Sequence, residues 1–171
     1  MKAVVQRVLR GCVRVEGEVV SSIGKGMVVL IGIHKDDTKV EMDYIVRKLV
    51  SLRMWEDDSD RRWAKSAKDL GLEILCVSQF TLYHVMKGNK PDFHLAMGGE
   101  QSKQFYNEFL GEMNKAYNKE KVKNGVFGAM MEVELVNDGP VTLELEALNQ
   151  KKLLENKKSE VEVKNDNASE N

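Results

Sequence analysis

The 171-residue sequence is poor in the features that mark several classes of protein. It has two cysteines, Cys12 and Cys76, which are too few for a disulfide framework and have no metal-binding spacing. Because this usage is typical of a reducing compartment, we expect a cytoplasmic protein, with the nucleus as the alternative. No stretch approaches the roughly 18 consecutive apolar residues of a membrane span. The first residues also lack the apolar run of a signal peptide, so we expect no membrane association.

Excess charge is also absent, since 26 basic residues face 27 acidic ones and the net charge is −1. No global field therefore attracts nucleic acid, and any such contact must come from a local patch. A hydrophobic fraction of 42% with 31% charged residues is typical of a globular protein. The length predicts one domain, at 1–148. Residues 149–171 have no hydrophobic period and few apolar groups, which predicts a disordered polar tail.

Proline is scarce as well, because only two occur, and Pro140 stands where a strand is expected. Apolar and acidic residues alternate over 132–135 and again over 141–146, which predicts two strands. The Asn-Asp-Gly sequence at 137–139 predicts a hairpin turn between them. Pro140 then opens the second strand, where it has no N–H to donate. An X-Pro bond is usually trans, and a cis bond is the less common alternative.

The remaining pattern predicts a mixture of strands and helices. Strands are expected at 2–9, 12–16, 18–22, 27–33 and 72–83, and helices at 38–50 and 100–117. The continuous apolar run at 27–33 indicates a buried central strand, and Gly32 within it marks a close approach of backbone. Thr38 and Glu41 have the spacing of a capping box at the start of the first helix.

Polar residues interrupt the otherwise apolar strand predicted at 72–83. Ser78, Gln79 and Thr81 need hydrogen-bond partners if buried, or a ligand that supplies them. The alternative is that they bond to neighbouring backbone. Thr81 is a candidate nucleophile only beside an activating base, and the sequence places none there.

A long connection at 84–98 follows this strand, and loops of this length in compact domains are usually functional or disordered. Its apolar content argues against disorder. Lys87 and Lys90 are suited to meeting phosphate. Phe93 is suited to stacking on a base, as aromatic residues of RNA-binding proteins do, or else it anchors the loop to the core. No nucleotide-binding glycine loop is present and the three histidines have no metal spacing, so we expect neither metal nor cofactor.

Four segments in order resemble the D-aminoacyl-tRNA deacylases, also called the D-tyrosyl-tRNA(Tyr) deacylase family, in their eukaryotic form. They are Ala-Val-Val-Gln-Arg-Val at 3–8, Ser-Gln-Phe-Thr-Leu at 78–82, Lys-Gly-Asn-Lys-Pro-Asp-Phe-His-Leu-Ala at 87–96 and Asn-Asp-Gly-Pro-Val-Thr at 137–142. Phe-Gly at 127–128, followed by Met131, also matches. The resemblance covers about 1–147 and leaves the tail uncovered.

The resemblance implies an α+β fold with curved, mostly antiparallel, barrel-like sheets and two main helices packed on them. It implies a homodimer that hydrolyses the ester between a D-amino acid, or glycine, and the terminal adenosine of tRNA, and that rejects L-aminoacyl-tRNA. This activity is chiral proofreading in translation.

The resemblance also assigns roles to residues. The catalytic set is Ser78, Gln79, Phe80 and Thr81. Gly139 and Pro140, joined by a cis bond, enter the partner subunit's active site and select chirality. The residues that bind substrate or tRNA are Lys87, Lys90, Phe93, Ala96 and Met131.

Two mechanisms remain open at this point. In one, backbone N–H groups near Phe80 and Thr81 hold the oxyanion while the substrate's 2′-hydroxyl assists attack. In the other, Thr81 is the nucleophile. An alternative function is a nucleic-acid-binding module at DNA replication origins, although a tail of balanced charge supplies little electrostatic affinity. A non-catalytic interaction protein would leave the polar residues at 78–81 unexplained.

Overall fold

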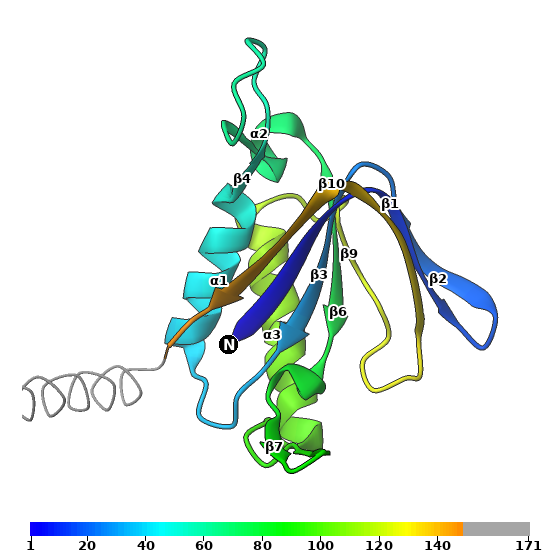
Figure 1. The fold of residues 1–171 in the computed structure, drawn as a ribbon, viewed down its shortest axis with the longest axis vertical. Coiled ribbons are helices and arrows are strands. Elements are labelled where there is room, and N and C mark those ends of the chain that lie inside the picture. The colour runs from blue at the N-terminus through cyan, green and yellow to red at the C-terminus, as the bar shows by residue number, and fades with distance from the viewer. Residues whose placement is uncertain (149–171) are drawn as a thin grey trace, which may run out of the picture.

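The computed structural model describes residues 1–148, and the tail predicted at 149–171 lies outside the described residues. A six-stranded sheet forms the centre of the molecule (Figure 1). Its strands are β10 (Glu132–Glu146), β1 (Lys2–Val15), β3 (Gly26–Gly32), β6 (Glu73–Ser78) and β9 (Val122–Asn124) in spatial order, with β2 (Glu18–Ile23) paired to β1. Strands β3, β6 and β9 run parallel to one another, and every other pairing is antiparallel.

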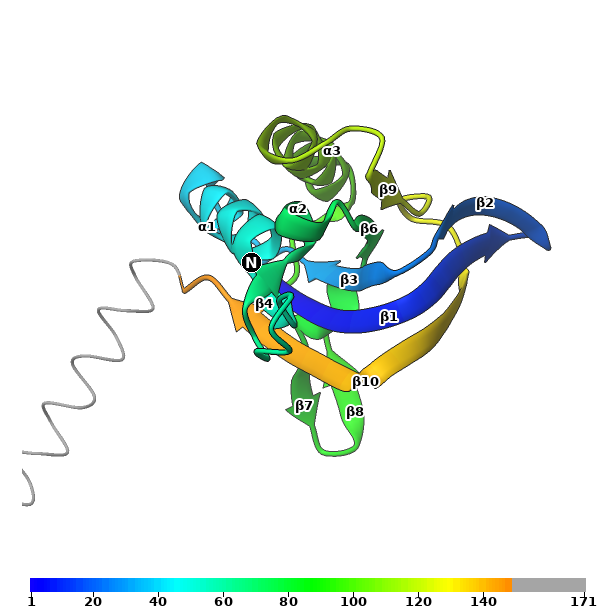
Figure 2. The same cartoon turned by 90° about the horizontal axis from the view of Figure 1, so that it is seen from above.

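The sheet curls strongly, so that β2 lies against β6 and β9 from across the sheet (Figure 2). The smaller elements are β4 (Arg53–Trp55), β5 (Lys65–Ser66), β7 (Val85–Lys87), β8 (Lys90–Asp92), a four-residue helix α2 (Ala67–Leu70) and a 3₁₀ turn η1 (Phe80–Leu82). The predicted fold class, α+β with a curved, mostly antiparallel and barrel-like sheet, is confirmed.

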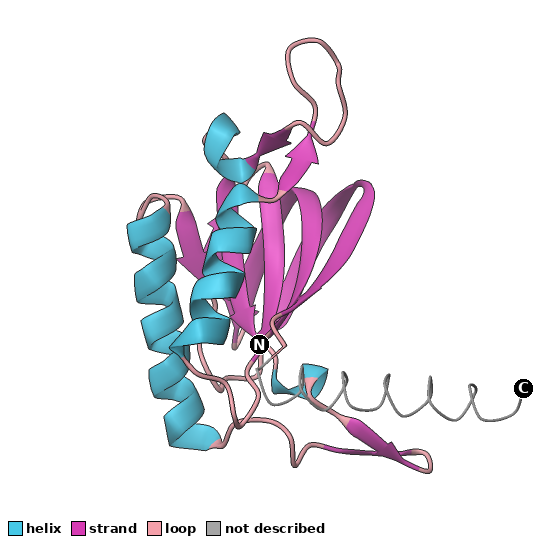
Figure 3. Cartoon of the chain, turned by 90° about the vertical axis from the view of Figure 1, so that its left-hand side faces the viewer, coloured by secondary structure: helices cyan, strands magenta, loops and turns pink. Residues whose placement is uncertain are grey.

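Two long helices, α1 (Lys39–Ser51) and α3 (Gly99–Ala116), lie side by side over one face of the sheet (Figures 2 and 3). Both predicted helices are therefore confirmed. Helix α1 starts where the sequence predicts, because the Thr38 side chain accepts from the Val40 N–H and the Glu41 carboxylate accepts from the Thr38 N–H at 2.8 Å. This reciprocal cap satisfies donors that would otherwise be lost at the helix start.

Alternation along the central strands divides the apolar residues between two cores. Met27, Val29 and Ile31 of β3 face the core beneath the helices, whereas Val28 faces a second core inside the curl of the sheet. The adjacent strand β6 divides in the same way, with Leu75 in the second core. Because both faces are covered, these strands read as continuous apolar runs rather than alternating ones.

The hairpin predicted around 137–139 is wrong. Both apolar–acidic runs belong to one strand, β10, and both pair with β1, which is itself one strand where two were predicted. Gln6 pairs with Thr142 and Val8 pairs with Asn137, so residues 138–141 bulge opposite Arg7. Such a bulge bends the strand and leaves its extra residues outside the ladder.

The strand predicted at 72–83 is also shorter than expected. Strand β6 ends at Ser78, because its neighbour β3 ends at Gly32 and offers little backbone beyond that point. The chain turns into η1, where the Tyr83 N–H donates to the Phe80 carbonyl at 3.0 Å. Within residues 1–148 no helix combines the length and apolar character needed to cross a membrane.

Candidate functional site

A cavity of about 640 Å³ opens where β6 runs into η1, opposite the start of α3. None of the side chains around it is charged. Its lining consists of Ile31, Ile33, Val77, Ser78, Gln79, Phe80, Phe93, Ala96, Met97, Gly98, Gly99, Ser102, Phe127, Gly128, Ala129, Met130, Met131 and Val133. Six predicted site residues therefore lie in one place: Ser78, Gln79, Phe80, Phe93, Ala96 and Met131.

The backbone at the cavity edge presents free donors. The Gln79 N–H donates to the Ile31 carbonyl at 2.7 Å, which fixes the end of β6 against β3. The next two N–H groups, of Phe80 and Thr81, have no hydrogen-bond partner among the described residues. Because they open the 3₁₀ turn, no acceptor of that turn precedes them. Phe80 lines the cavity, whereas Thr81, the next residue, does not. The edge of the site thus carries two adjacent main-chain donors available to a ligand.

Gly32 allows η1 to sit this close to β3. A Cβ atom at this position would lie 2.9 Å from Leu82 Cβ and 3.3 Å from the Gln79 carbonyl oxygen. A separation under 3.0 Å requires the neighbouring atoms to move, since interiors are close-packed. The close approach predicted at Gly32 is therefore confirmed, and it supports the turn that carries Phe80 and Thr81.

Thr81 has a hydrogen-bond donor rather than a base beside its hydroxyl. Gln79 Nε2 donates to Thr81 Oγ1 at 2.6 Å, and the ring of His84 lies 2.9 Å from the Thr81 carbonyl oxygen instead of the hydroxyl. An amide N–H cannot accept a proton from the hydroxyl, so this arrangement does not activate Thr81. The buried Cys76 is no alternative nucleophile, since burial raises the pKa of its thiol to about 12.

Two aromatic rings form one wall of the cavity. Phe80 and Phe93 meet edge to face with centroids 5.1 Å apart, and Phe80 is 56% exposed. Phe93 is half-buried and lines the cavity, so the structure does not place it in either core. A flat group entering here meets exposed aromatic surface from both residues.

The predicted phosphate-binding lysines lie outside the cavity lining, on the β7–β8 hairpin. Lys87 Nζ forms an ion pair with Asp92 Oδ2 at 2.6 Å, and hydrogen bonds from Lys87 and His94 hold the pKa of the Asp92 carboxyl well below its usual range. Lys87 is therefore already engaged by a carboxylate. Lys90, at the other end of the turn, is exposed.

Gly139 and Pro140 are exposed and do not line the cavity of their own chain. Their peptide bond is cis. Arg7 holds the adjoining bulge, because its guanidinium Nε donates to the Asp138 carbonyl at 3.1 Å and another of its nitrogens, Nη1, donates to the Met54 carbonyl. Arg7 lies in the matching segment at 3–8, but no role was predicted for it, since a basic residue in a strand carries no distinctive signal.

Other residues of the cavity were missed as well. Phe127 was noted only as part of a matching segment. Its ring packs against that of the buried Tyr106, with the ring centroids 5.6 Å apart. Gly98, Gly99 and Ser102 were interpreted only as part of a loop and a helix. Two glycines directly before a helix are the signal that could have identified an open helix start.

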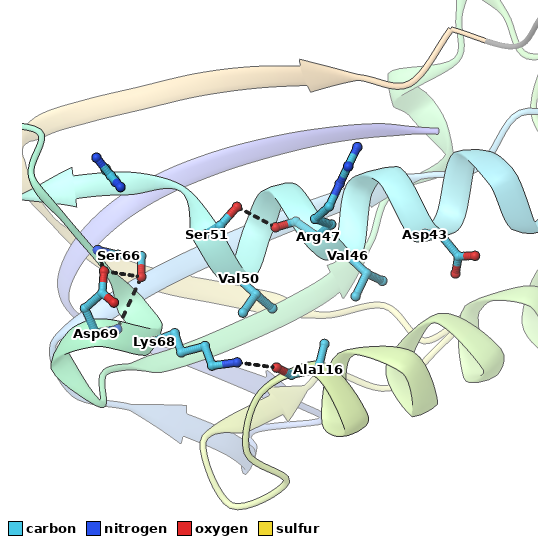
Figure 4. Close-up of a pocket in the computed structure, with 10 residues that line it drawn as sticks. Asp43, Val46, Arg47, Val50, Ser51, Ser66, Lys68, Asp69 and Ala116 are labelled. Carbon is cyan, nitrogen blue, oxygen red and sulfur yellow. Dashed lines mark hydrogen bonds between the residues drawn. The ribbon is translucent and has the colours of Figure 1, made fainter.

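A second hollow, of about 450 Å³, lies between α1, α2 and the end of α3 (Figure 4). Some of its polar groups bond to one another: Ser51 Oγ donates to the Arg47 carbonyl at 2.7 Å, and Lys68 Nζ donates to the Ala116 carbonyl at 3.1 Å. Ser66 and Asp69 form the cap of α2. The side chains of Ser51, Ser66, Lys68 and Asp69 are therefore engaged in bonds within the protein. No cluster of three or more metal-ligating side chains occurs within the described residues.

The fold and the cavity define a small α+β protein whose site offers main-chain donors in place of charged side chains. The chain is similar to D-aminoacyl-tRNA deacylase 1 of Homo sapiens, with 57% identity over 147 residues, 86% of this chain and 70% of that one. It is 54% identical to D-aminoacyl-tRNA deacylase of Drosophila melanogaster over 151 residues, covering 88% and 95% of the two chains.

A solved structure named c-Myc DNA Unwinding Element Binding Protein has a TM-score of 0.84 and 57% identity, covering 86% of this chain and 99% of that one. The family model for D-Tyr-tRNA(Tyr) deacylase matches residues 4–146. The chain therefore belongs to the D-Tyr-tRNA(Tyr) deacylase family.

Proposed function

We propose that this protein is a D-aminoacyl-tRNA deacylase, which hydrolyses the ester between a D-amino acid, or glycine, and the 3′-terminal adenosine of tRNA. The observation that carries this proposal is the pair of unpartnered N–H groups of Phe80 and Thr81 at the edge of an uncharged cavity. Ester hydrolysis develops negative charge on the carbonyl oxygen. Preorganised main-chain donors stabilise that charge, and the loss of one such donor typically slows a reaction about 10²–10³-fold.

The reaction proceeds without a titratable side chain in the cavity. Water attacks the ester carbonyl, and the oxygen that becomes negative accepts hydrogen bonds from Phe80 and Thr81. The vicinal 2′-hydroxyl of the substrate's ribose assists the proton transfers. The bond from the carbonyl carbon to the ribose oxygen then breaks, the ribose regains its hydroxyl and the amino acid leaves as a carboxylate. Thr81 Oγ1 accepts from Gln79 and orders the turn rather than attacking.

Substrate selection is assigned to Gly139 and Pro140 of a second copy of the chain. Both residues are exposed and absent from the lining of their own chain's cavity, while Phe80 and Met130 leave large apolar surfaces at the cavity, with Met130 93% exposed. A homodimer in which the dipeptide enters the partner's cavity covers these surfaces. An L side chain then meets rigid backbone, whereas a D side chain or the hydrogen of glycine does not.

The decisive experiment incubates the full chain with D-aminoacyl-tRNA, glycyl-tRNA and L-aminoacyl-tRNA carrying the same tRNA. Release of the D-amino acid and glycine, with the L ester intact, supports the proposal. Specific activity should also fall when dilution dissociates the dimer, as followed by sedimentation. Tight binding of duplex DNA without any hydrolysis would instead favour the DNA-binding alternative, the function named for one solved relative.

A further inference from the structure

The start of helix α3 opens onto the cavity without a side-chain cap. Its N-cap residue is Gly98, and no side chain bonds to the first turn. The first N–H that has an intrahelical partner is that of Ser102, which donates to the Gly98 carbonyl at 2.8 Å. The N–H groups of Gly99, Glu100 and Gln101 have no partner among the described residues. Both glycines line the cavity, so the open turn faces the site.

Ser102 adds a side-chain hydroxyl at the same place. The residue is 8% exposed and lines the cavity, and its side chain has no hydrogen-bond partner in the described part of the chain. Side chains on an α-helix lean toward its N-terminus, so this hydroxyl lies toward the open N–H groups. Because Ser102 lines the cavity, its hydroxyl is available to donate to a ligand there.

We propose that the first turn of α3 and Ser102 form a phosphate subsite, which binds the phosphodiester attached to the 5′ oxygen of the RNA's terminal adenosine. This inference rests on the proposed function, because it assumes that the terminal nucleotide of RNA occupies the cavity. Helix N-termini attract anions through free N–H groups and the helix dipole. Ser102 donates one further hydrogen bond to a phosphate oxygen.

No acidic side chain lines the cavity to oppose a phosphate at this turn. Glu100, the acidic residue of the first turn, is exposed and does not line the cavity. The lysines of the β7–β8 hairpin supply no competing cation inside the cavity, since neither lines it. The free N–H groups at the helix start therefore suit it to an anion, and a terminal adenosine carries one phosphate on its 5′ side.

The test measures binding of adenosine and adenosine 5′-monophosphate to the full-length protein by calorimetry. We expect the monophosphate to bind about tenfold more tightly than adenosine, as a hydrogen bond to a charged group predicts. Ser102→Ala should remove most of that advantage and leave adenosine binding unchanged. Gly99→Pro removes one N–H from the turn at a position where proline is tolerated, and a Cβ there meets nothing within 4 Å. It should also reduce the advantage.

Ser51→Ala is the matched control, because it removes an exposed helix hydroxyl that lines the second hollow. In deacylation assays Ser102→Ala should raise KM for D-aminoacyl-tRNA several-fold and leave kcat near wild type.

Three results would overturn the subsite: equal binding of adenosine and its monophosphate by the wild type, equal weakening of both by Ser102→Ala, or comparable affinity for inorganic phosphate alone. Each is compatible with intact deacylation and so leaves the proposed function standing. A preserved preference for the monophosphate without hydrolysis would show the reverse, that the phosphate site is real and the assigned reaction is wrong.

Discussion

Arg7 and Asp138 meet through two contacts, one to the backbone and one to the side chain. The guanidinium Nε lies 3.1 Å from the Asp138 carbonyl oxygen and 3.3 Å from its carboxylate Oδ2. The same guanidinium reaches the Met54 carbonyl, so β1, β4 and the bulge of β10 are connected through one side chain. Both partners are partly buried, with side chains 19% and 26% exposed. Arg7 therefore fixes the segment that carries Gly139 and Pro140.

Arg7→Lys should lower kcat/KM for D-aminoacyl-tRNA about tenfold while the protein stays folded. Lysine keeps the charge but lacks the planar fork that spans the Asp138 and Met54 carbonyls, and losing one hydrogen bond to a charged group costs about 1.5–3 kcal/mol. The control is Arg14→Lys, on the same strand, where the pairing with Glu134 is at 3.9 Å and more exposed. Equal activities of the two variants would show that Arg7 has no role in positioning the site.

Gly32→Ala should reduce kcat on the order of 10²-fold, because an added methyl group would displace η1 and with it the donors of Phe80 and Thr81. Gly111→Ala is the matched control: a Cβ there meets nothing within 4 Å and the residue lies inside α3. Gly111→Ala should raise the free energy of unfolding by up to about 1 kcal/mol and leave kcat unaltered. Single-turnover rates and thermal unfolding of both variants check this, and wild-type turnover in Gly32→Ala would contradict it.

Thr81→Val should retain most of the deacylase activity. Valine preserves the shape of threonine and removes the hydroxyl that accepts from Gln79, which costs order in the turn but no nucleophile. Rapid-quench mass spectrometry of the wild type should find no aminoacyl-enzyme. A covalent adduct on Thr81, or complete inactivity of a folded Thr81→Val variant, would establish the nucleophilic mechanism instead.

Phe93→Ala should weaken tRNA binding more than it slows the chemical step. The ring lines the cavity and supports Phe80 edge to face, and stacking on a base is worth about 1–3 kcal/mol. KM should therefore rise roughly tenfold or more, with a smaller change in single-turnover rate. Phe93→Tyr keeps the ring and is the control. An unchanged KM in a folded Phe93→Ala protein would assign the ring to structure alone.

The cap and apolar-run signals in the sequence were reliable, whereas the turn signal and the strand pairing inferred from it were not. The Thr38–Glu41 cap and the apolar run of β3 were predicted because each depends on neighbouring residues. The hairpin at 137–139 was wrong because the acceptor of both runs is β1, more than 100 residues away in the sequence. Alternation shows which face of a strand is buried, but it does not identify the strand that pairs with it.

The candidate site shows the same difference between features set by neighbouring residues and features set by distant ones. The polar residues at 78–81 were identified because they interrupt an apolar strand, but their 3₁₀ turn depends on where β3 ends. Ser102 looked like any helical residue, and only the fold brings it to the cavity. Arg7 lies in a matching segment, but its role was not predicted because its partners, Asp138 and Met54, lie far along the chain.

Gly139→Ala tests whether the exposed bulge selects chirality. Gly139 has a φ of +122°, which L residues rarely adopt, and an added Cβ would lie 3.1 Å from both an Arg7 guanidinium nitrogen and Val141 Cγ2. The substitution must shift the backbone locally, at a cost of about 1–3 kcal/mol, and moves the Gly-Pro segment that the proposal places against the substrate's Cα. We expect the variant either to lose D-aminoacyl-tRNA turnover or to begin hydrolysing the L ester.

The control for that experiment is Gly17→Ala, because Gly17 has a φ of +84° and a Cβ there meets nothing within 4 Å. It carries a comparable backbone cost in the β1–β2 turn, away from the bulge, so it separates lost stability from lost selection. The measurement is the ratio of kcat/KM for D- and L-aminoacyl-tRNA in the wild type and both variants, with the proposed dimer checked by sedimentation. Gly17→Ala should keep the wild-type ratio. If Gly139→Ala keeps it too, with full D turnover, then discrimination lies elsewhere in the cavity, because a rigid backbone filter cannot move and still reject the same enantiomer.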